Sequence, residues 1–545
     1  MDSEISACAP PSHSGVSVFK PALFITIVAL SFLGAIIGMQ IIVTLGISAN
    51  TSIIGAVLAI LLSRIPAAAF STFRYIDAQN LVQTAISSAT FAAANGLLIS
   101  IGVPWALGMH ELIWPMLAGS SLALVIDGTI LYGVFNSRAF PASGSWPAGV
   151  ATAETLWAGN QGGKRLGLLV VGFAAGIAGA YAGIPMASAG IALIGSIFAL
   201  MMFAIGLLVR GYSESGLIHY NLYEHFVPHG FMIGAGLVAL LQIGWIVVKK
   251  RRDADTQEID NNPELAFSSA RLKKSLLTGA VFYFITALLL TGLTQLFTHM
   301  SFPMLIGFLL FATAAALVQE MVVGMAAMHS GWFPATAAAL ISLVVGMLLG
   351  FPPEALAVLV GFCTATGPAF ADMGFDLKTG FMIRGYGKDL EQERYGRRQQ
   401  YIAAMIGFAC AMIVVALSYQ FYFSQDKIVP ASRLYAATIQ AGKSSNIATM
   451  LLIWAVPGAL LQLIGGARHQ IGVLFSTGLM IHYPIAGWTV LAALAVRLLL
   501  VNVFRISSDR ISTLAGGLIA GDALTSAATA LYPALKAKIL SMLSH

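Results

Sequence analysis

Long apolar runs separated by short polar stretches follow one another along the whole chain. Each run has about 17–25 residues, the length at which an α-helix spans the hydrocarbon core of a bilayer. Charged residues gather in two stretches between apolar runs, KKRRDADTQEIDNNPELAFSSARLKK (249–274) and RGYGKDLEQERYGRR (384–398). The pattern predicts an all-α polytopic membrane protein with about 14 to 16 transmembrane helices, 16 being the favoured number.

The composition agrees with this class of protein. Only 10% of the residues are charged and 58% are hydrophobic, whereas soluble domains carry about 25% charged residues. The net charge of +6 does not indicate nucleic-acid binding, because both basic stretches are interrupted by carboxylates and fit cytoplasmic loops under the positive-inside rule. The expected partners are therefore the lipid bilayer and a small solute, and the sequence leaves a homo-oligomer open.

The longer basic stretch divides the chain into parts of similar span number. We expect a cytoplasmic N-terminal tail (1–20), an N-terminal transmembrane half (21–248), a cytoplasmic basic loop (249–274), a C-terminal transmembrane half (275–533) and a C-terminal tail (534–545). Transporters are often built from two structurally related halves with broken or re-entrant helices around a midplane site. We expect the same organisation here.

Three carboxylates interrupt the apolar runs. A charged side chain in the bilayer core costs several kcal/mol, so each one is a functional candidate. Asp127 lies in the middle of its run and fits either a proton or cation site or a structural carboxylate. Glu320 lies nearer the end of its run, which favours an interfacial carboxylate with access to water. Asp522 stands in GGLIAGDALTS, where glycines can unwind a helix and expose carbonyls.

Two further stretches combine glycines with ionisable residues. FPASGSWPAGVATAETLWAGN (140–160) contains Glu154, and its prolines and glycines are expected to prevent a simple helix, which favours a re-entrant element lining a cavity. FADMGFDLKTGFMIRG (370–385) places Asp372 and Asp376 on one helical face and Lys378 off that face. On spacing alone, the second stretch is typical of an interfacial helix end.

Four short stretches together resemble the oligopeptide transporter superfamily, which includes peptide importers and the yellow-stripe-like metal–chelate transporters. They are NLVQTAISSA (80–89), FPASGSWPAGVATAETLWAG (140–159), DLKTGFMIRG (376–385) and GGLIAGDAL (516–524). The insertion ASGSW and Phe381, where the family usually has tyrosine, depart from the family pattern and leave the substrate open. The short loops and tails resemble those of bacterial members, which implies a bacterial inner membrane. With the basic stretch at 249–274 cytoplasmic, a further crossing expected around 136–163 would make the number of spans before it even and place the N-terminus in the cytoplasm.

The resemblance implies proton-coupled import of oligopeptides or amino-acid-derived metal chelates by alternating access. No cofactor is expected, and no metal site beyond metal carried as cargo. The candidates for substrate binding or proton coupling are Asp127, Glu154, Asp522, Glu320, Asn80 and Gln83. The resemblance also favours interpreting the 370–385 stretch as a structured element at the inner mouth of the pathway. Gly374 and Gly380 would let the backbone turn there. The gate or vestibule candidates in this stretch are Asp372, Asp376 and Lys378.

Other functions fit some of the same features. An exporter or a channel for small polar solutes would use the same polar cavity and remains an alternative. An intramembrane aspartyl protease would need two carboxylates that share a proton, and Asp127 and Asp522 have no paired motif around them. The chain also lacks His-Glu-x-x-His and Gly-x-Ser-x-Gly. The sequence therefore favours a transporter over an enzyme.

Overall fold

The computed structural model describes residues 15–45, 51–137, 139–213, 221–254, 269–331, 335–442 and 445–543. Every regular element among these residues is a helix, and a single isolated bridge joins Phe135 to Phe140. Ten of the helical stretches in this part of the chain are long and apolar enough to cross a bilayer, and four shorter apolar helices accompany them. The prediction of an all-α polytopic membrane protein is confirmed.

The helices follow one another with short connections. Those before the basic loop are α1 (Pro21–Leu45), α2 (Thr51–Ser63), α3 (Ile76–Phe91), α4 (Ile99–Leu107), α5 (Ile113–Val134), α6 (Pro147–Gln161), α7 (Gly163–Tyr181), α8 (Met186–Ile194), α9 (Ile197–Ser213) and α10 (Val227–Ala254). Those after it are α11 (Ser269–Leu293), α12 (Phe302–Ser330), α13 (Ala335–Leu348), α14 (Pro353–Ala365), α15 (Pro368–Ile383), α16 (Leu390–Phe423), α17 (Pro430–Ala441), α18 (Ser445–His469), α19 (Ile471–Met480), α20 (Pro484–Asn502) and α21 (Ser508–Leu543).

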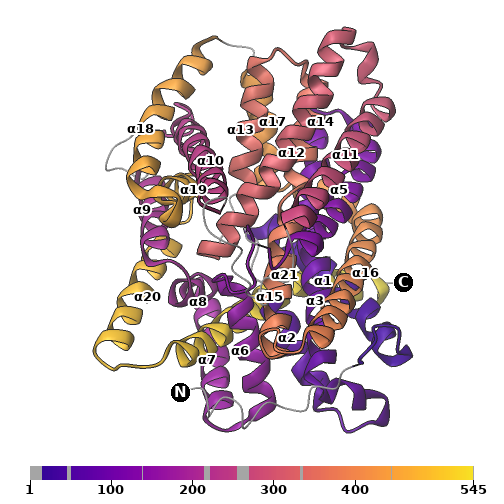
Figure 1. Cartoon of the computed structure of the whole chain (residues 1–545), viewed down its shortest axis with the longest axis vertical. Helices are drawn as coiled ribbons and strands as arrows, with labels where there is room; N and C mark the ends of the chain where they lie inside the picture. The colour runs from indigo at the N-terminus through magenta and orange to yellow at the C-terminus, as the bar shows by residue number, and fades with distance from the viewer. Residues whose placement is uncertain are drawn as a thin grey trace.

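Two of the candidate spans, 76–107 and 353–383, are enclosed by protein over almost their whole length, from 78 to 104 and from 355 to 383. In the first, a π-helical segment (Ala92–Leu98) joins α3 to α4; in the second, the helix is interrupted between α14 and α15. α3 packs against α15 (Figure 1), and α4 packs against α14. The two enclosed spans therefore run in opposite directions and bring their irregular centres together. Such interruptions are tolerated at membrane depth only where protein surrounds them.

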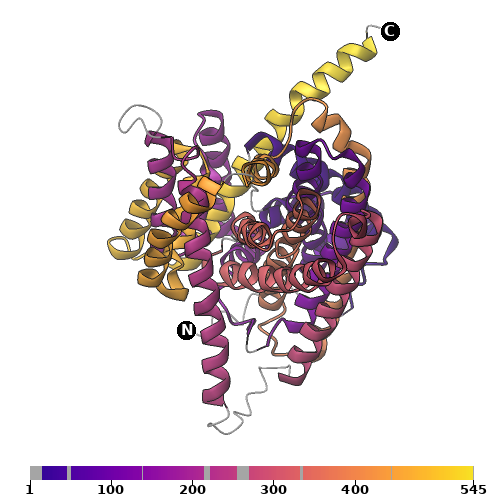
Figure 2. The ribbon, with the colours of Figure 1, turned by 90° about the horizontal axis from the view of Figure 1, so that it is seen from above.

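The remaining helices form two regions around these spans. α8, α9, α10, α18, α19 and α20 pack against one another, and Figure 2 shows this group on one side of the bundle. α1, α5, α11, α12 and α16 cover the enclosed spans on the other side (Figure 1). α21 packs along α7 and α8 and also contacts α1, so it links the two regions.

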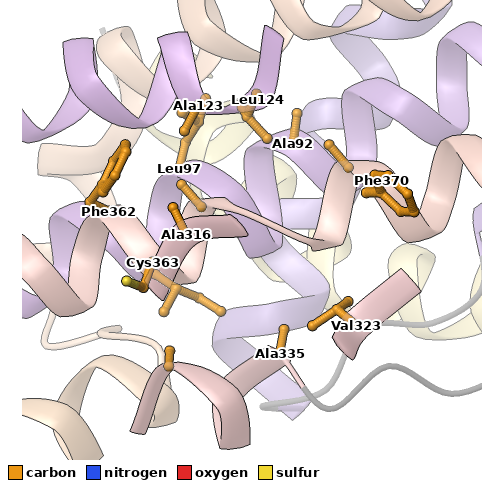
Figure 3. Close-up of a cluster of buried hydrophobic side chains, with 14 of the residues drawn as sticks. Ala92, Leu97, Ala123, Leu124, Ala316, Val323, Ala335, Phe362, Cys363 and Phe370 are labelled. Atoms are coloured by element: carbon orange, nitrogen blue, oxygen red, sulfur yellow. The ribbon is translucent and has the colours of Figure 1, made fainter. Parts of the chain in front are cut away.

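The largest apolar core surrounds the interruption between α14 and α15. Figure 3 shows side chains from the π-helical segment and from α5, α12, α13, α14 and α15 converging there, among them Ala92, Leu97, Ala123, Leu124, Ala316, Val323, Ala335, Phe362, Cys363 and Phe370. Because these side chains exclude water, a charged group at this place must find its partners within the protein.

The glycine- and proline-rich segment 140–160 is irregular only in its first part. Trp146 is fully buried and adopts a left-handed backbone with φ of 34°. α6 then begins at Pro147, because proline suits the first helical position, where its missing N–H is not needed. The prediction that this segment cannot form a simple helix is therefore wrong from Pro147 onward.

Three predicted domain boundaries fall inside helices. α10 continues past residue 249 to Ala254 and α11 begins at Ser269, before residue 274. α21 likewise runs beyond residue 533 to Leu543. A helix satisfies its own backbone hydrogen bonds and so need not end where its apolar run ends. The centre of the predicted basic loop (255–268) and most of the predicted N-terminal tail (1–14) lie outside the described residues.

Candidate functional site

Asp127 on α5 closes the interruption between α14 and α15. Its Oδ1 and Oδ2 accept hydrogen bonds from the backbone N–H of Gly367 at 3.0 and 2.8 Å. Oδ2 also accepts one from the backbone N–H of Phe370 at 3.0 Å. These N–H groups belong to the start of α15, where a helix has unpaired donors and a partial positive charge. The fully buried carboxylate thus caps the second half of a broken span.

Tyr283 on α11 links this carboxylate to a second one on α12. The phenol oxygen lies 3.2 Å from Asp127 Oδ1 and 3.3 Å from Glu320 Oε2. All three side chains are completely buried, and Glu320 Oε1 makes no hydrogen bond among the described residues. We call this group the acid–phenol cluster (Asp127, Tyr283 and Glu320).

The prediction that Glu320 is an interfacial carboxylate with access to water is wrong. Its exposed fraction is 0%, and its side chain points from α12 toward the phenol of Tyr283 on α11. The sequence position measures how far along a helix a residue lies, but it does not reveal which side of that helix faces protein. The acid–phenol cluster therefore combines two predicted residues with Tyr283, which sequence reasoning missed.

A second buried polar group lies where α3 crosses α15. Ser87 Oγ donates to Asp372 Oδ1 at 2.6 Å, and Ser52 Oγ donates to Asp376 Oδ1 at 3.2 Å. Gln83 Nε2 also donates to Asp376 Oδ1, and the two serine hydroxyls are 2.7 Å apart. All five side chains are fully buried. We call this group the α3–α15 cluster (Ser52, Gln83, Ser87, Asp372 and Asp376).

The predicted turns at Gly374 and Gly380 are absent, because α15 continues as a helix through both to Ile383. A Cβ at Gly374 would lie 2.2 Å from the ring of Trp146, so this glycine provides room for a side chain rather than a bend. The whole of α15 is buried. The prediction that these glycines turn the backbone is therefore wrong, whereas a gate or vestibule role for Asp372 and Asp376 remains a prediction.

Lys378 lies off the face that carries the two aspartates, as the spacing predicted. Its Nζ donates to the backbone oxygens of Ala142 and Gly144 at 2.8 and 3.0 Å. Neither of its hydrogen bonds reaches a carboxylate; both hold the irregular segment before α6 against α15. Lys378 thus positions that segment, and a gating role for it remains a prediction.

A buried ion triad follows the α3–α15 cluster along the chain. Arg384 Nε lies 2.7 Å from Glu393 Oε2, and Arg397 Nη2 lies 3.0 Å from Glu393 Oε1. All three side chains are buried. The sequence predicted that they lie in a cytoplasmic loop. The four-residue spacing of Glu393 and Arg397, which places them on one helical face, is the one signal that could have indicated the pair.

Gln400 connects the triad to the α3–α15 cluster. Its Oε1 accepts a hydrogen bond from Arg384 Nη1 at 3.0 Å, and its Nε2 donates to the backbone oxygen of Asp376 at 2.7 Å. The same Nε2 lies 3.1 Å from Thr84 Oγ1. A continuous path of hydrogen bonds thus runs from the buried aspartates to the α15–α16 connection.

The other predicted residues lie apart from these clusters. Glu154 on α6 is buried, and its Oε2 lies 3.7 Å from Nη1 of Arg165 on α7, which is 38% exposed. Asn80 is buried next to a cavity of about 20 Å³ that Arg384 also lines, which is room for about one water molecule. Asn80 therefore faces the triad side of α3, one turn away from Gln83.

Asp522 caps a different helix. Its Oδ2 accepts a hydrogen bond from the backbone N–H of Ala187, at the start of α8, at 2.5 Å. The prediction that the glycines near it unwind the helix is wrong, because α21 is continuous from Ser508 to Leu543. Those glycines allow close packing instead: a Cβ at Gly521 would lie 2.2 Å from the backbone oxygen of Phe173 on α7.

Among the described residues, no group of three or more His, Cys, Asp or Glu side chains could hold a metal ion. The chemistry available at the two central clusters is therefore that of carboxylates, a phenol, hydroxyls and an amide. Such groups bind and release protons, hard cations and polar solutes.

Comparison with known families gives one match. The family described as OPT oligopeptide transporter protein matches residues 184–532, about two thirds of the chain. This range includes α15, with both aspartates of the α3–α15 cluster, and Asp522 on α21. A search of curated proteins finds no match.

Proposed function

We propose that this chain, which belongs to the OPT oligopeptide transporter family, imports oligopeptides or amino-acid-derived metal chelates by proton-coupled alternating access. Family membership and the multi-pass helical fold support a membrane transporter in general terms. The direction of transport, the coupling ion and the substrate class are our proposal. We further propose that it works in a bacterial inner membrane with its N-terminus in the cytoplasm.

The acid–phenol cluster is the observation that carries the proposal of proton coupling. Tyr283 has one phenolic hydrogen, yet carboxylate oxygens of both Asp127 and Glu320 lie within hydrogen-bond distance of it. With both carboxylates ionised, one of them would face only the lone pairs of the phenol oxygen. One additional proton removes this conflict, because each contact then has its own hydrogen.

The partners of each carboxylate indicate where that proton resides. Asp127 accepts from the backbone N–H groups of Gly367 and Phe370, and such donors stabilise the ionised form. Glu320 has the phenol of Tyr283 as its hydrogen-bond partner, and its second oxygen has none in the described part of the chain. In our proposal Glu320 carries the transported proton, and Asp127 remains the anionic cap of α15.

The same cluster couples protonation to movement. α15 is the second half of an interrupted span, so it can tilt about the interruption at Gly367 without breaking its own hydrogen bonds. Loss of the proton from Glu320 would add a second negative charge beside Asp127. This charge would change the electrostatic interaction between the carboxylates and the start of α15. Because α15 also carries Asp372 and Asp376, this change is transmitted to its contact with α3. A coupled transporter needs such a link between ion occupancy and conformation.

Transport into proteoliposomes tests the proposal. Labelled dipeptide, tripeptide and an amino-acid-derived iron chelate are offered with and without an inward proton gradient, with the membrane potential clamped. The proposal expects saturable accumulation of at least one substrate that requires the gradient. Accumulation that ignores the gradient would exclude proton coupling, flux that never saturates would favour a channel, and accumulation driven only by an outward gradient would favour export.

Variants of the acid–phenol cluster test whether gradient-driven accumulation depends on Glu320. Glu320→Gln keeps the shape of a protonated glutamate, so it should still exchange substrate across the membrane but should not accumulate it on a proton gradient. Glu391→Gln makes the same chemical change at an exposed position of α16 and should transport like the parent. Gradient-driven accumulation by Glu320→Gln would remove Glu320 from the mechanism.

A further inference from the structure

The α3–α15 cluster has more oxygen acceptors than hydrogens to satisfy them. Asp372 Oδ2, Asp376 Oδ2 and Gln83 Oε1 are buried and make no hydrogen bond among the described residues. In addition, Ser52 and Ser87 take part in three oxygen–oxygen contacts, to each other and to one aspartate each. Two hydroxyl hydrogens cannot serve three such contacts at once. The cluster is therefore short of positive charge or of hydrogen-bond donors.

The two basic residues that follow Asp376 most closely in the chain do not supply that charge. Lys378 is two residues from Asp376, but its Nζ donates to the backbone oxygens of Ala142 and Gly144. Arg384 is paired with Glu393 at 2.7 Å and reaches the cluster only through the neutral amide of Gln400. Two adjacent buried carboxylates without a counter-charge are unfavourable inside a membrane.

The orientation of Gln83 points to a ligand. Its amide nitrogen donates to Asp376 Oδ1, and this fixes the amide, because the opposite orientation would place two acceptor oxygens together. The amide oxygen is consequently buried and makes no hydrogen bond within the described part of the chain. A neutral carbonyl oxygen beside carboxylates and hydroxyls forms an all-oxygen set, which hard cations prefer.

We propose that the α3–α15 cluster binds a small alkali cation, for which Na⁺ is the probe. Asp372 Oδ2, Asp376 Oδ2 and Gln83 Oε1 are its ligands, and the hydroxyl oxygens of Ser52 and Ser87 complete the shell. A single positive charge neutralises part of the aspartate pair and holds α15 against α3. The proposal goes beyond the proposed function and does not depend on it, since proton coupling is assigned to the acid–phenol cluster.

Thermal unfolding of the purified full-length protein in detergent tests the site directly. NaCl replaces choline chloride stepwise at constant ionic strength and pH, so that only the cation changes. A ligand that binds the native state raises stability by mass action, and we expect a saturable rise in Tm of about 2–4 °C. A Tm that is the same in NaCl and choline chloride, but that shifts with pH, would overturn the proposal in favour of protons at the aspartates.

Variants distinguish Na⁺ binding at the α3–α15 cluster from a general effect of salt on Tm. Asp376→Asn and the milder Ser87→Ala should lower the Na⁺-dependent rise at least twofold. Asp426→Asn is the matched control, because Asp426 is 80% exposed and has a φ of 59°, which asparagine accepts; it should keep the full rise. If Asp376→Asn does not fold, the Na⁺-dependent rise in Tm is measured on Ser87→Ala and Gln83→Leu instead. Full Na⁺ responses in the folded variants would overturn the assignment.

The experiment is also distinct from the test of the proposed function. Glu320→Gln should retain the Na⁺-dependent rise in Tm while it loses proton-driven accumulation. A Na⁺ response that disappears in Glu320→Gln would contradict the assignment of the cation to the α3–α15 cluster.

Discussion

The carboxylate of Asp127 accepts both a 2.8 Å and a 3.0 Å hydrogen bond from the backbone N–H of Gly367, although the two residues are 240 positions apart in the chain. This contact joins a span of the N-terminal half to the point where a span of the C-terminal half is interrupted. A charged side chain at membrane depth is thereby placed on a helix terminus that favours negative charge.

Replacing Asp127 should affect both stability and transport. Asp127→Ala removes the acceptor for the N–H groups at the start of α15, and loss of such a cap costs about 0.5–2 kcal/mol in soluble proteins. We expect a lower Tm and at least a tenfold loss of uptake, measured on purified protein and in proteoliposomes. Asp127→Asn retains one acceptor and should lose less stability. Wild-type uptake by both variants would show that the cap is not needed for transport.

Removing the bridge between the two carboxylates should change coupling more than folding. Tyr283→Phe keeps the ring packed among apolar side chains but deletes the hydroxyl that reaches Asp127 and Glu320. We expect substrate exchange to continue while gradient-driven accumulation falls at least tenfold. Uptake is measured at several external pH values; the parent should accelerate as external pH falls, and Tyr283→Phe should respond less. An unchanged pH profile would argue against the bridge.

The buried ion triad should respond strongly to loss of its single acid. Glu393→Gln leaves Arg384 and Arg397 buried without a carboxylate between them, and breaking a buried pair costs about 3–5 kcal/mol. We expect a large fall in Tm and in the yield of folded protein, measured by size-exclusion chromatography with a fluorescent fusion. Glu391→Gln, on the exposed side of the same helix, is the control. Equal yields for both variants would contradict the structural role of the triad.

Close packing of α7 on α21 depends on glycine. A Cβ at Gly521 would approach the backbone oxygen of Phe173 to 2.2 Å, whereas one at Gly167 on the same pair of helices would meet no atom within 4 Å. We expect Gly521→Ala to lower Tm by several degrees and Gly167→Ala to leave it nearly unchanged or raise it slightly. If both substitutions have the same effect, the helices pack less closely than described.

The sequence identified the class of protein and most of the buried acids, because a charged residue in an apolar run is unusual whatever the fold. It could not show which side chains these acids contact in the folded protein. Tyr283 looks like any aromatic residue in a span, and its contacts to Asp127 and Glu320 depend on how α5, α11 and α12 are arranged. Gln83 and its partner Asp376 are separated by 293 positions in the chain. A single sequence carries no signal of contact between residues so far apart.

Glycine misled the sequence interpretation for a physical reason. The same residue allows a turn, a broken helix or the close approach of another chain segment. At Gly374 and Gly521 the structure uses the third of these, whereas at Gly367 it uses glycine for a left-handed backbone with φ of 98°. Only the packed structure distinguishes these uses.

In the proposed mechanism, protons drive transport through Glu320. The most direct measurement is substrate-induced proton uptake into proteoliposomes containing a pH-sensitive dye, with the parent protein compared with Glu320→Gln. We expect substrate to acidify the lumen for the parent, and Glu320→Gln to bind and exchange the same substrate without acidification. Equal acidification by the two proteins, or substrate uptake by the parent without any proton movement, would contradict this mechanism.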